Sequence, residues 1–255
     1  MKSQLFGRCE KNSRLVAPSL NAFFTSLGRV DAMTSIWSIW LEPPPGGALA
    51  QRSGEFIKVQ SARLKPHGAS GPFAPHVTLV GGFECSLEEA RKRTVQLAAD
   101  LARIPVAPFM DVTKGERFHQ CVYMRVEPND QLATAHAIAA EAFGVKAGNG
   151  GGSPYMPHLS LVYGDLPESD KDACVAEAAA QLYGDVEVRG GWEATNISLW
   201  RTDVSDATCE SWERVELVPL RKCSLVKWAR FYEDYIKRTQ SPDGSPRDSP
   251  RSARG

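Results

Sequence analysis

The chain has 255 residues, of which 42% are hydrophobic and 24% are charged, and its 30 basic and 30 acidic side chains cancel. This composition is typical of a soluble globular protein with one large or two small domains. Because there is no global positive field, stable binding of long nucleic acids is not expected, and a small anionic substrate fits better. No apolar run approaches the roughly 20 residues of a membrane-spanning helix, so no membrane partner is expected.

The cysteines form no C-x-x-C pair and no Cys/His cluster, which argues against a structural zinc site. They are Cys9, Cys85, Cys121, Cys174, Cys209 and Cys223. We therefore expect chemistry without a metal or another cofactor, and reduced, mostly buried thiols.

Both ends of the chain differ from its middle. Residues 1–34 carry several basic and Ser residues and only Glu10 and Asp31 as acids, which is the composition of an organellar transit peptide. A disordered extension, or a true start at Met33, explains it equally well. Residues 236–255 resemble a disordered Ser/Pro/Arg tail. We place the globular part at 35–235 and expect a cytoplasmic protein, with mitochondrial or plastid targeting as the alternative.

Strands and helices are mixed along the globular part. Strands are predicted at residues 35–41, 75–80, 106–113, 118–127, 157–162, 186–189, 195–202 and 212–220. Helices are predicted at 48–64, 86–102, 129–143 and 167–182, the second opened by a capping box from Ser86 to Glu89. Lys114-Gly115 is expected to form the turn between the third and fourth strands. The order favours an α+β fold of two pseudo-symmetric lobes, each an antiparallel sheet with outer helices.

Two stretches are near copies of each other: Pro75-His-Val-Thr-Leu-Val80 and Pro157-His-Leu-Ser-Leu-Val162. In a strand, successive side chains point to opposite faces, so His76 shares a face with Thr78, and His158 shares a face with Ser160. The aliphatic residues between them face the core. Each strand is therefore a plausible half-site, and two facing lobes bring both half-sites to one cleft.

The paired motifs suit the hydrolysis of a phosphodiester. One neutral imidazole takes a proton from water, while the other, protonated, gives one to the leaving oxygen on the far side of phosphorus. Thr78 and Ser160 donate hydrogen bonds to the non-bridging oxygens. An unperturbed imidazole titrates near pH 6.5, so one neutral and one charged copy coexist near neutrality. The two motifs are chemically alike, so the sequence does not decide which is the base; His158 as base and His76 as acid is the starting assignment.

Other candidate residues receive no catalytic role. His67, His119 and His136 lack a hydroxyl two positions later, and an isolated histidine is more often structural. The glycine-rich run 148–153 lacks the Lys and the following helix of a P-loop, so we interpret it as an entry loop. Trp37 and Trp40 are expected in the core, although one of them could stack on a base.

With these motifs the chain resembles the 2H phosphoesterase superfamily, and most closely its plant and fungal cyclic phosphodiesterases. The similarity spans about residues 35–220 and is most specific in Ser153-Pro-Tyr-Met-Pro-His-Leu-Ser-Leu-Val-Tyr163. It implies the bilobal 2H phosphoesterase (LigT-like) fold and metal-independent hydrolysis by a monomer. The implied substrates are ADP-ribose 1″,2″-cyclic phosphate, a by-product of tRNA splicing that yields ADP-ribose 1″-phosphate, and nucleoside 2′,3′-cyclic phosphates, which yield 2′-phosphates.

The resemblance also carries residue roles. His76 and His158 fall on the catalytic positions, and Thr78, Ser160 and Tyr163 on substrate-binding positions. By strand alternation Tyr163 falls on the face opposite Ser160, so it reaches the site only if the strand end twists or bulges. Two alternatives stay open: an enzyme that processes RNA ends, as in the 2′,5′-RNA ligase-like and exonuclease branches, and a nucleotide-binding module without turnover.

Overall fold

The computed structural model describes residues 34–146 and 154–221. Their strands are β1 (Ser35–Leu41), β2 (Val77–Cys85), β3 (Ile104–Val106), β4 (Phe109–Arg117), β5 (Gln120–Val126), β6 (His158–Val162), β7 (Trp192–Ala194), β8 (Asn196–Arg201) and β9 (Glu213–Pro219). Seven of them form a sheet in the order β4-β5-β6-β2-β1-β8-β9, and every neighbouring pair is antiparallel. The remaining two, β3 and β7, form a small antiparallel sheet of their own.

The centre of the large sheet is the short pairing between β2 and β6, where Val77 lies opposite Leu159. This pairing joins the half-sheet β4-β5-β6 to the half-sheet β2-β1-β8-β9, so the two predicted sheets are continuous. Because the strands are antiparallel, the register places His76 across from Ser160 on one side of this pair and Thr78 across from His158 on the other. The predicted α+β class is confirmed.

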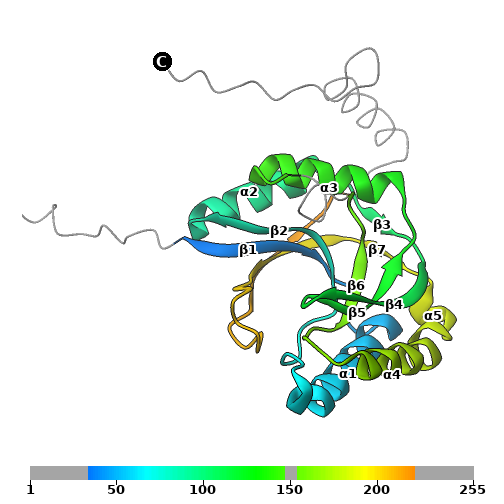
Figure 1. Cartoon of the computed structure of the whole chain (residues 1–255). Coiled ribbons are helices and arrows are strands. Elements are labelled where there is room, and N and C mark those ends of the chain that lie inside the picture. The colour runs from blue at the N-terminus through cyan, green and yellow to red at the C-terminus, as the bar shows by residue number, and fades with distance from the viewer. Residues whose placement is uncertain (1–33, 147–153, 222–255) are drawn as a thin grey trace, which may run out of the picture. The chain divides into compact units, whose positions relative to one another are not determined.

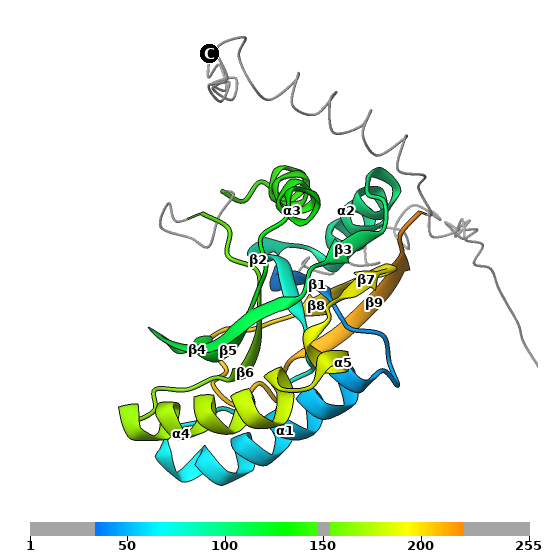
Figure 2. The same ribbon diagram turned by 90° about the vertical axis from the view of Figure 1, so that its right-hand side faces the viewer.

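Helices cover both half-sheets. They are α1 (Ala48–Leu64), α2 (Leu87–Asp100), α3 (Asp130–Phe143), α4 (Glu168–Ala178) and α5 (Val186–Arg189), with short turns η2 (Lys65–His67) and η3 (Ala179–Tyr183). In both views α2 and α3 lie on one side of the strands, and α1 and α4 lie on the other (Figures 1 and 2). Two helices cross between halves: α1 follows β1 but packs against β6, and α3 follows β5 but packs against β2.

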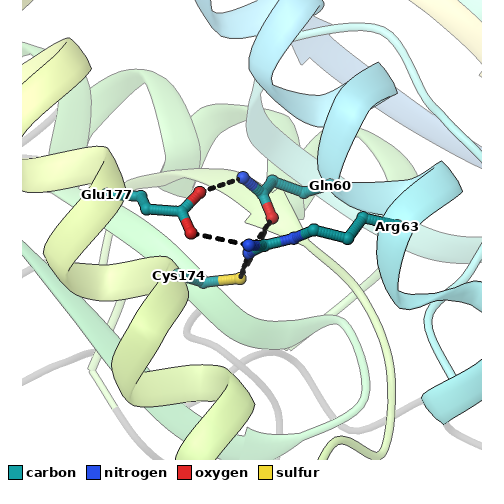
Figure 3. A network of polar contacts seen from close by, with 4 residues as sticks. All are labelled: Gln60, Arg63, Cys174 and Glu177. Atoms are coloured by element: carbon teal, nitrogen blue, oxygen red, sulfur yellow. Dashed lines mark hydrogen bonds and ion pairs between the residues drawn. The ribbon is translucent and has the colours of Figure 1, made fainter.

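The interface of α1 with α4 contains a polar network (Figure 3). The amide of Gln60 donates to Glu177 at 2.6 Å, and Arg63 donates to the other oxygen of the same carboxylate at 2.7 Å. The Cys174 thiol donates to the side-chain amide oxygen of Gln60, Oε1, at 3.5 Å. Gln60 and Cys174 are buried, so each of these polar groups finds a partner at the interface.

Local sequence explains the helix starts. Ser86 accepts a hydrogen bond from the backbone N–H of Glu89 at 3.2 Å, as expected from the capping pattern. Asn129 caps α3 by accepting from Leu132 N–H at 2.8 Å. The strands contribute a continuous aliphatic core, in which Ile39, Val77, Leu79, Leu159 and Leu161 are completely buried.

The turn predicted at Lys114-Gly115 is wrong. Both residues lie inside β4, and the chain turns at Phe118-His119 before β5. Gly115 is needed for close approach rather than for a turn, because a Cβ there would lie 2.5 Å from the carbonyl oxygen of Gln120. The strand predicted from residue 118 therefore begins two residues later, and His119 sits at a turn.

Three other predictions required correction. Residues 186–189 form the helix α5 rather than a strand, with the Asp185 side chain accepting from Glu187 N–H at 2.8 Å. The strand predicted at 106–113 is divided into β3 and β4, with Pro108 between them. The first motif strand, predicted at 75–80, begins at Val77 and continues to Cys85.

Several predictions lie outside the described residues. These are the extension up to residue 33, the glycine-rich run 148–153 and the tail 236–255. Where the structure describes the chain, no helix has both the length and the apolarity needed to cross a membrane.

Candidate active site

A cavity of about 660 Å³ lies over the joint between the half-sheets. The two motif histidines, His76 just before β2 and His158 at the start of β6, both line it. Thr78 and Tyr163 line it as well. The strand pairing thus brings together motifs that are about eighty residues apart in the sequence, at one cavity, as expected from the repeat.

The two imidazoles are held in the same way. Nδ1 of His76 lies 2.6 Å from the carbonyl oxygen of Ala74, and Nδ1 of His158 lies 2.9 Å from that of Met156. A carbonyl oxygen only accepts, so Nδ1 carries the proton in both rings. Proline stands between acceptor and histidine in both motifs and restricts the residue before it to extended conformations. Each neutral ring therefore keeps the Nε2 lone pair for a ligand.

Aromatic rings surround His76 more tightly than His158. The indole of Trp40 stacks on the His76 ring with centroids 3.4 Å apart, and Phe73 meets it edge-on at 6.2 Å. Among the described residues His158 has one such neighbour, Tyr123, at 5.0 Å. His76 is 4% exposed, whereas His158 is partly buried.

Burial changes the acidity of both histidines. It lowers the pKa of His76 to about 3, opposed by the hydrogen bond to Ala74 and assisted by the charge of His158. It also lowers the pKa of His158, opposed by the hydrogen bond to Met156. In the free protein both rings are consequently neutral at pH 7, which differs from the expectation of unperturbed values near 6.5.

The two motif hydroxyls differ. Thr78 is partly buried and lines the cavity, whereas Ser160 is buried and does not. The Ser160 hydroxyl donates to the carbonyl oxygen of His119 at 3.2 Å and is hydrogen-bonded to the hydroxyl of Tyr163. Tyr163, not Ser160, thus lines this wall of the cavity.

Tyr163 reaches the cavity because β6 ends at Val162. Gly164, which follows Tyr163, has φ +152, and a Cβ there would lie 2.6 Å from the Gly68 carbonyl oxygen. Strand alternation therefore no longer applies to Tyr163, which stacks on Phe73 at 3.8 Å. Burial raises the pKa of its hydroxyl, so it is a neutral donor at physiological pH.

The charge of the cavity suits an anion. Arg117 and Lys146 are among its lining residues, and none of the described lining residues is acidic. Arg125, the third basic residue near the motifs, is not in the lining and forms an ion pair with Asp111. Among the residues that the structure describes, no group of three or more His, Cys, Asp or Glu side chains is arranged to hold a metal ion.

The lining residues that the sequence did not assign to the site include His119, His136 and Trp40. His136 is buried on α3, where Nδ1 donates to the Leu79 carbonyl oxygen at 2.6 Å. Trp40 shares a strand face with Ser38, which also lines the cavity, while Trp37 points to the core. Strand alternation in β1 could have separated the two tryptophans, but only the fold brings His119 and His136 to the site.

The comparisons with known proteins identify the family of this chain. Residues 33–220 match the family model described as "Cyclic phosphodiesterase-like protein". The chain is 28% identical over 186 residues to the "Cyclic phosphodiesterase" of Arabidopsis thaliana, covering 72% of this chain and 95% of that protein. It is 26% identical over 213 residues to the "2′,3′-cyclic-nucleotide 3′-phosphodiesterase" of Yarrowia lipolytica, covering 69% and 95%.

Two solved structures are similar at lower identity. LigT of E. coli, complexed with 3′-AMP, is 16% identical with a TM-score of 0.46, covering 74% of this chain and 99% of that chain. Usb1 of Kluyveromyces marxianus is 11% identical with a TM-score of 0.40, covering 73% and 98%. On the match of the family model, the chain belongs to the cyclic phosphodiesterase-like family of the 2H phosphoesterases and is a hydrolase of cyclic phosphodiesters.

Proposed function

We propose that the reaction takes place between His76 and His158, without a metal ion. The observation that carries this proposal is the matched pair of anchored Nδ1 atoms, which fixes both rings and leaves both Nε2 atoms for proton transfer. Water attacks phosphorus with help from one imidazole, and the leaving oxygen takes a proton from the other. Thr78 donates a hydrogen bond to a non-bridging oxygen. Tyr163 donates a second one when Ser160 turns its single hydroxyl proton from the His119 carbonyl to the Tyr163 oxygen, and in this way Ser160 positions Tyr163.

The proposed substrates are nucleoside 2′,3′-cyclic phosphates, hydrolysed to 2′-phosphates, and ADP-ribose 1″,2″-cyclic phosphate, hydrolysed to ADP-ribose 1″-phosphate. The similarity to the Yarrowia relative, a 2′,3′-cyclic-nucleotide 3′-phosphodiesterase, supports the first. A cavity with basic and no acidic described lining residues suits both anions. The second substrate would connect the enzyme to by-products of tRNA splicing.

We assign His76 as the acid and His158 as the base. Stacking on Trp40 favours the charged form of His76, because an indole face attracts a cation. Burial opposes that charge, and the bound phosphate anion compensates for it. Once protonated, an imidazole whose pKa is lowered by burial is a strong acid toward the leaving oxygen.

A sulfur leaving group tests this assignment, because a thiolate leaves without a proton. A 2′,3′-cyclic phosphate with sulfur at the 3′ bridging position should restore turnover to His76→Gln but not to His158→Gln. Rescue of the His158 variant alone would reverse the two roles while leaving the pair intact.

The main experiment measures hydrolysis of 2′,3′-cyclic AMP, ADP-ribose 1″,2″-cyclic phosphate and a short RNA with a cyclic end. His76→Gln and His158→Gln should each lower kcat by about 10³-fold or more, at the upper range of a lost acid or base. His67→Gln is the matched control, since His67 is exposed and pairs with Asp170 at the surface. Near-normal turnover in both site variants, binding without turnover, or a 3′-phosphate product would contradict the proposal, and preference for the RNA would favour the RNA-end alternative.

A further inference from the structure

His119 occupies a rigid turn at the wall of the cavity. Its own carbonyl oxygen accepts from Ser160 Oγ at 3.2 Å, and the carbonyl oxygen of the preceding Phe118 accepts from Gly164 N–H at 3.0 Å. These contacts tie two backbone carbonyls of the β4–β5 turn to Ser160 in β6 and to Gly164 just after it. Since the carbonyl oxygens stay in place whatever side chain residue 119 carries, the imidazole is not needed for these contacts.

The imidazole is oriented by aromatic rings. The Tyr163 ring meets it edge-on at 5.0 Å, the Phe118 ring at 4.9 Å, and Trp212 lies across from it at 5.9 Å with 23° between the planes. Both Tyr163 and Trp212 line the cavity with it. The ring therefore has a defined position beside the groups that bind phosphate.

Nε2 of His119 is buried and has no hydrogen-bond partner among the described residues. Leaving a buried polar atom unpaired costs about 1–3 kcal/mol, so such an atom in a cavity calls for an explanation. The proposed acid, base and phosphate contacts do not use it. His119 lines the cavity, so a ligand there can satisfy Nε2 once the ring turns this atom, which is buried in the free protein, toward it.

We propose that His119 Nε2 hydrogen-bonds an uncharged polar group in the nucleoside part of the substrate, and that His119 thereby favours nucleoside cyclic phosphates over cyclic phosphates that lack a nucleoside. This inference rests on the proposed function and names a specificity residue for it. Phosphate has its own donors in Thr78 and Tyr163, whereas a sugar hydroxyl or a base edge has none assigned. Burial lowers the pKa of His119, so its ring is neutral at pH 7 and suits a neutral partner.

The test compares 2′,3′-cyclic AMP with glycerol 1,2-cyclic phosphate, which has the same reacting ring but no nucleoside. His119→Phe keeps an aromatic ring and loses the nitrogen. It should lower kcat/KM for 2′,3′-cyclic AMP about tenfold, the size of one uncharged hydrogen bond, mainly by raising KM. Turnover of glycerol 1,2-cyclic phosphate should stay within about twofold. His119→Gln, which retains a polar side chain, should recover most of the nucleotide activity.

His67→Phe is the matched control and should change neither activity, while thermal unfolding checks that each variant is folded. An equal loss on both substrates, or a loss on neither, would overturn the proposal. Calorimetric binding of adenosine 2′-monophosphate and inorganic phosphate gives a second readout that does not need turnover. If the wild-type protein hydrolyses neither compound, the proposed function fails; the His119 proposal then stands only if His119→Phe weakens the nucleotide about tenfold and spares phosphate.

Discussion

The indole of Trp40 lies parallel to the imidazole of His76, with the ring centroids 3.4 Å apart and 5° between the planes. Trp40 also stacks on Trp200, with the ring centroids 4.3 Å apart, so its indole is held by a second ring. The His76 ring is thus fixed in two ways, by the stack and by the hydrogen bond from Nδ1 to Ala74. A proton donor accelerates the reaction only when it is held in the correct position beside the leaving oxygen.

Trp40→Leu should therefore impair the chemical step. The imidazole loses the flat surface that holds it, and we expect kcat to fall about tenfold or more with little change in KM. Trp37→Leu is the control, because Trp37 is fully buried in the core on the opposite face of β1. Both variants should be destabilised by about 2–4 kcal/mol in urea unfolding, but only Trp40→Leu should lose kcat. If Trp40→Leu and Trp37→Leu lost kcat equally, the stack of Trp40 on His76 would act only through the stability of the fold.

Substrate binding should be accompanied by proton uptake. Burial lowers the pKa of both His76 and His158, so both are neutral at pH 7 in the free protein. A bound phosphate anion favours the charged imidazole and raises its pKa. Calorimetric titration with adenosine 2′-monophosphate at pH 7, in two buffers of different ionisation enthalpy, should show uptake of up to one proton. His76→Gln should reduce that uptake, and proton release would contradict the assignment.

Ser160 and Tyr163 should behave as one unit. Their hydroxyls are hydrogen-bonded, and only Tyr163 lines the cavity. Ser160→Ala and Tyr163→Phe should each lower kcat about tenfold, and the double variant should be little worse than either. Thr78→Val, which removes a hydroxyl at the opposite half-site, should cost up to about 10²-fold and add to both losses. Full additivity of the Ser160 and Tyr163 effects would show that Ser160 contacts the phosphate itself.

Stability should decrease in mild acid. His76 has a folded-state pKa lowered to about 3, so the unfolded chain binds its proton first as the pH falls. The contribution of neutral His76 to the free energy of unfolding is complete above about pH 6.5. It is lost as the pH falls toward 3, by up to about 1.4 kcal/mol per pH unit. Urea unfolding between pH 7 and 4.5 should show this slope, shared with the other buried histidines. His76→Gln should flatten it, and an unchanged slope would place the effect elsewhere.

The sequence predicted the motif pair well because the chemistry and the strand pattern occupy the same few residues. His76 and Thr78 need only the two-residue period of a strand to share a face. Tyr163 was harder, since alternation puts it on the wrong side; the strand end at Val162 and the backbone of Gly164 decide its position. No local pattern contains that information.

His119 was missed for a related reason. Glycine is a common signal for a turn. Gly115, however, lies inside β4 and leaves room for the backbone of β5 to approach. The turn lies at Phe118-His119 instead. His119, which the sequence predicts to be in a strand, therefore lines the cavity. His136 depends on α3 crossing to β2, which only the tertiary fold determines.

That crossing has a consequence beyond the site. Since α1 packs against β6 and α3 packs against β2, each half-sheet loses one of its covering helices when taken alone, although α2 and α4 pack against strands of their own halves. The two half-sheets depend on each other for packing and are not independent folding units. The half-sheet β2-β1-β8-β9 also takes its strands from both sides of β4, β5 and β6 in the sequence, so no single cut separates the halves. A chain cut between β2 and β6 should therefore yield insoluble pieces instead of two folded lobes, each with one histidine.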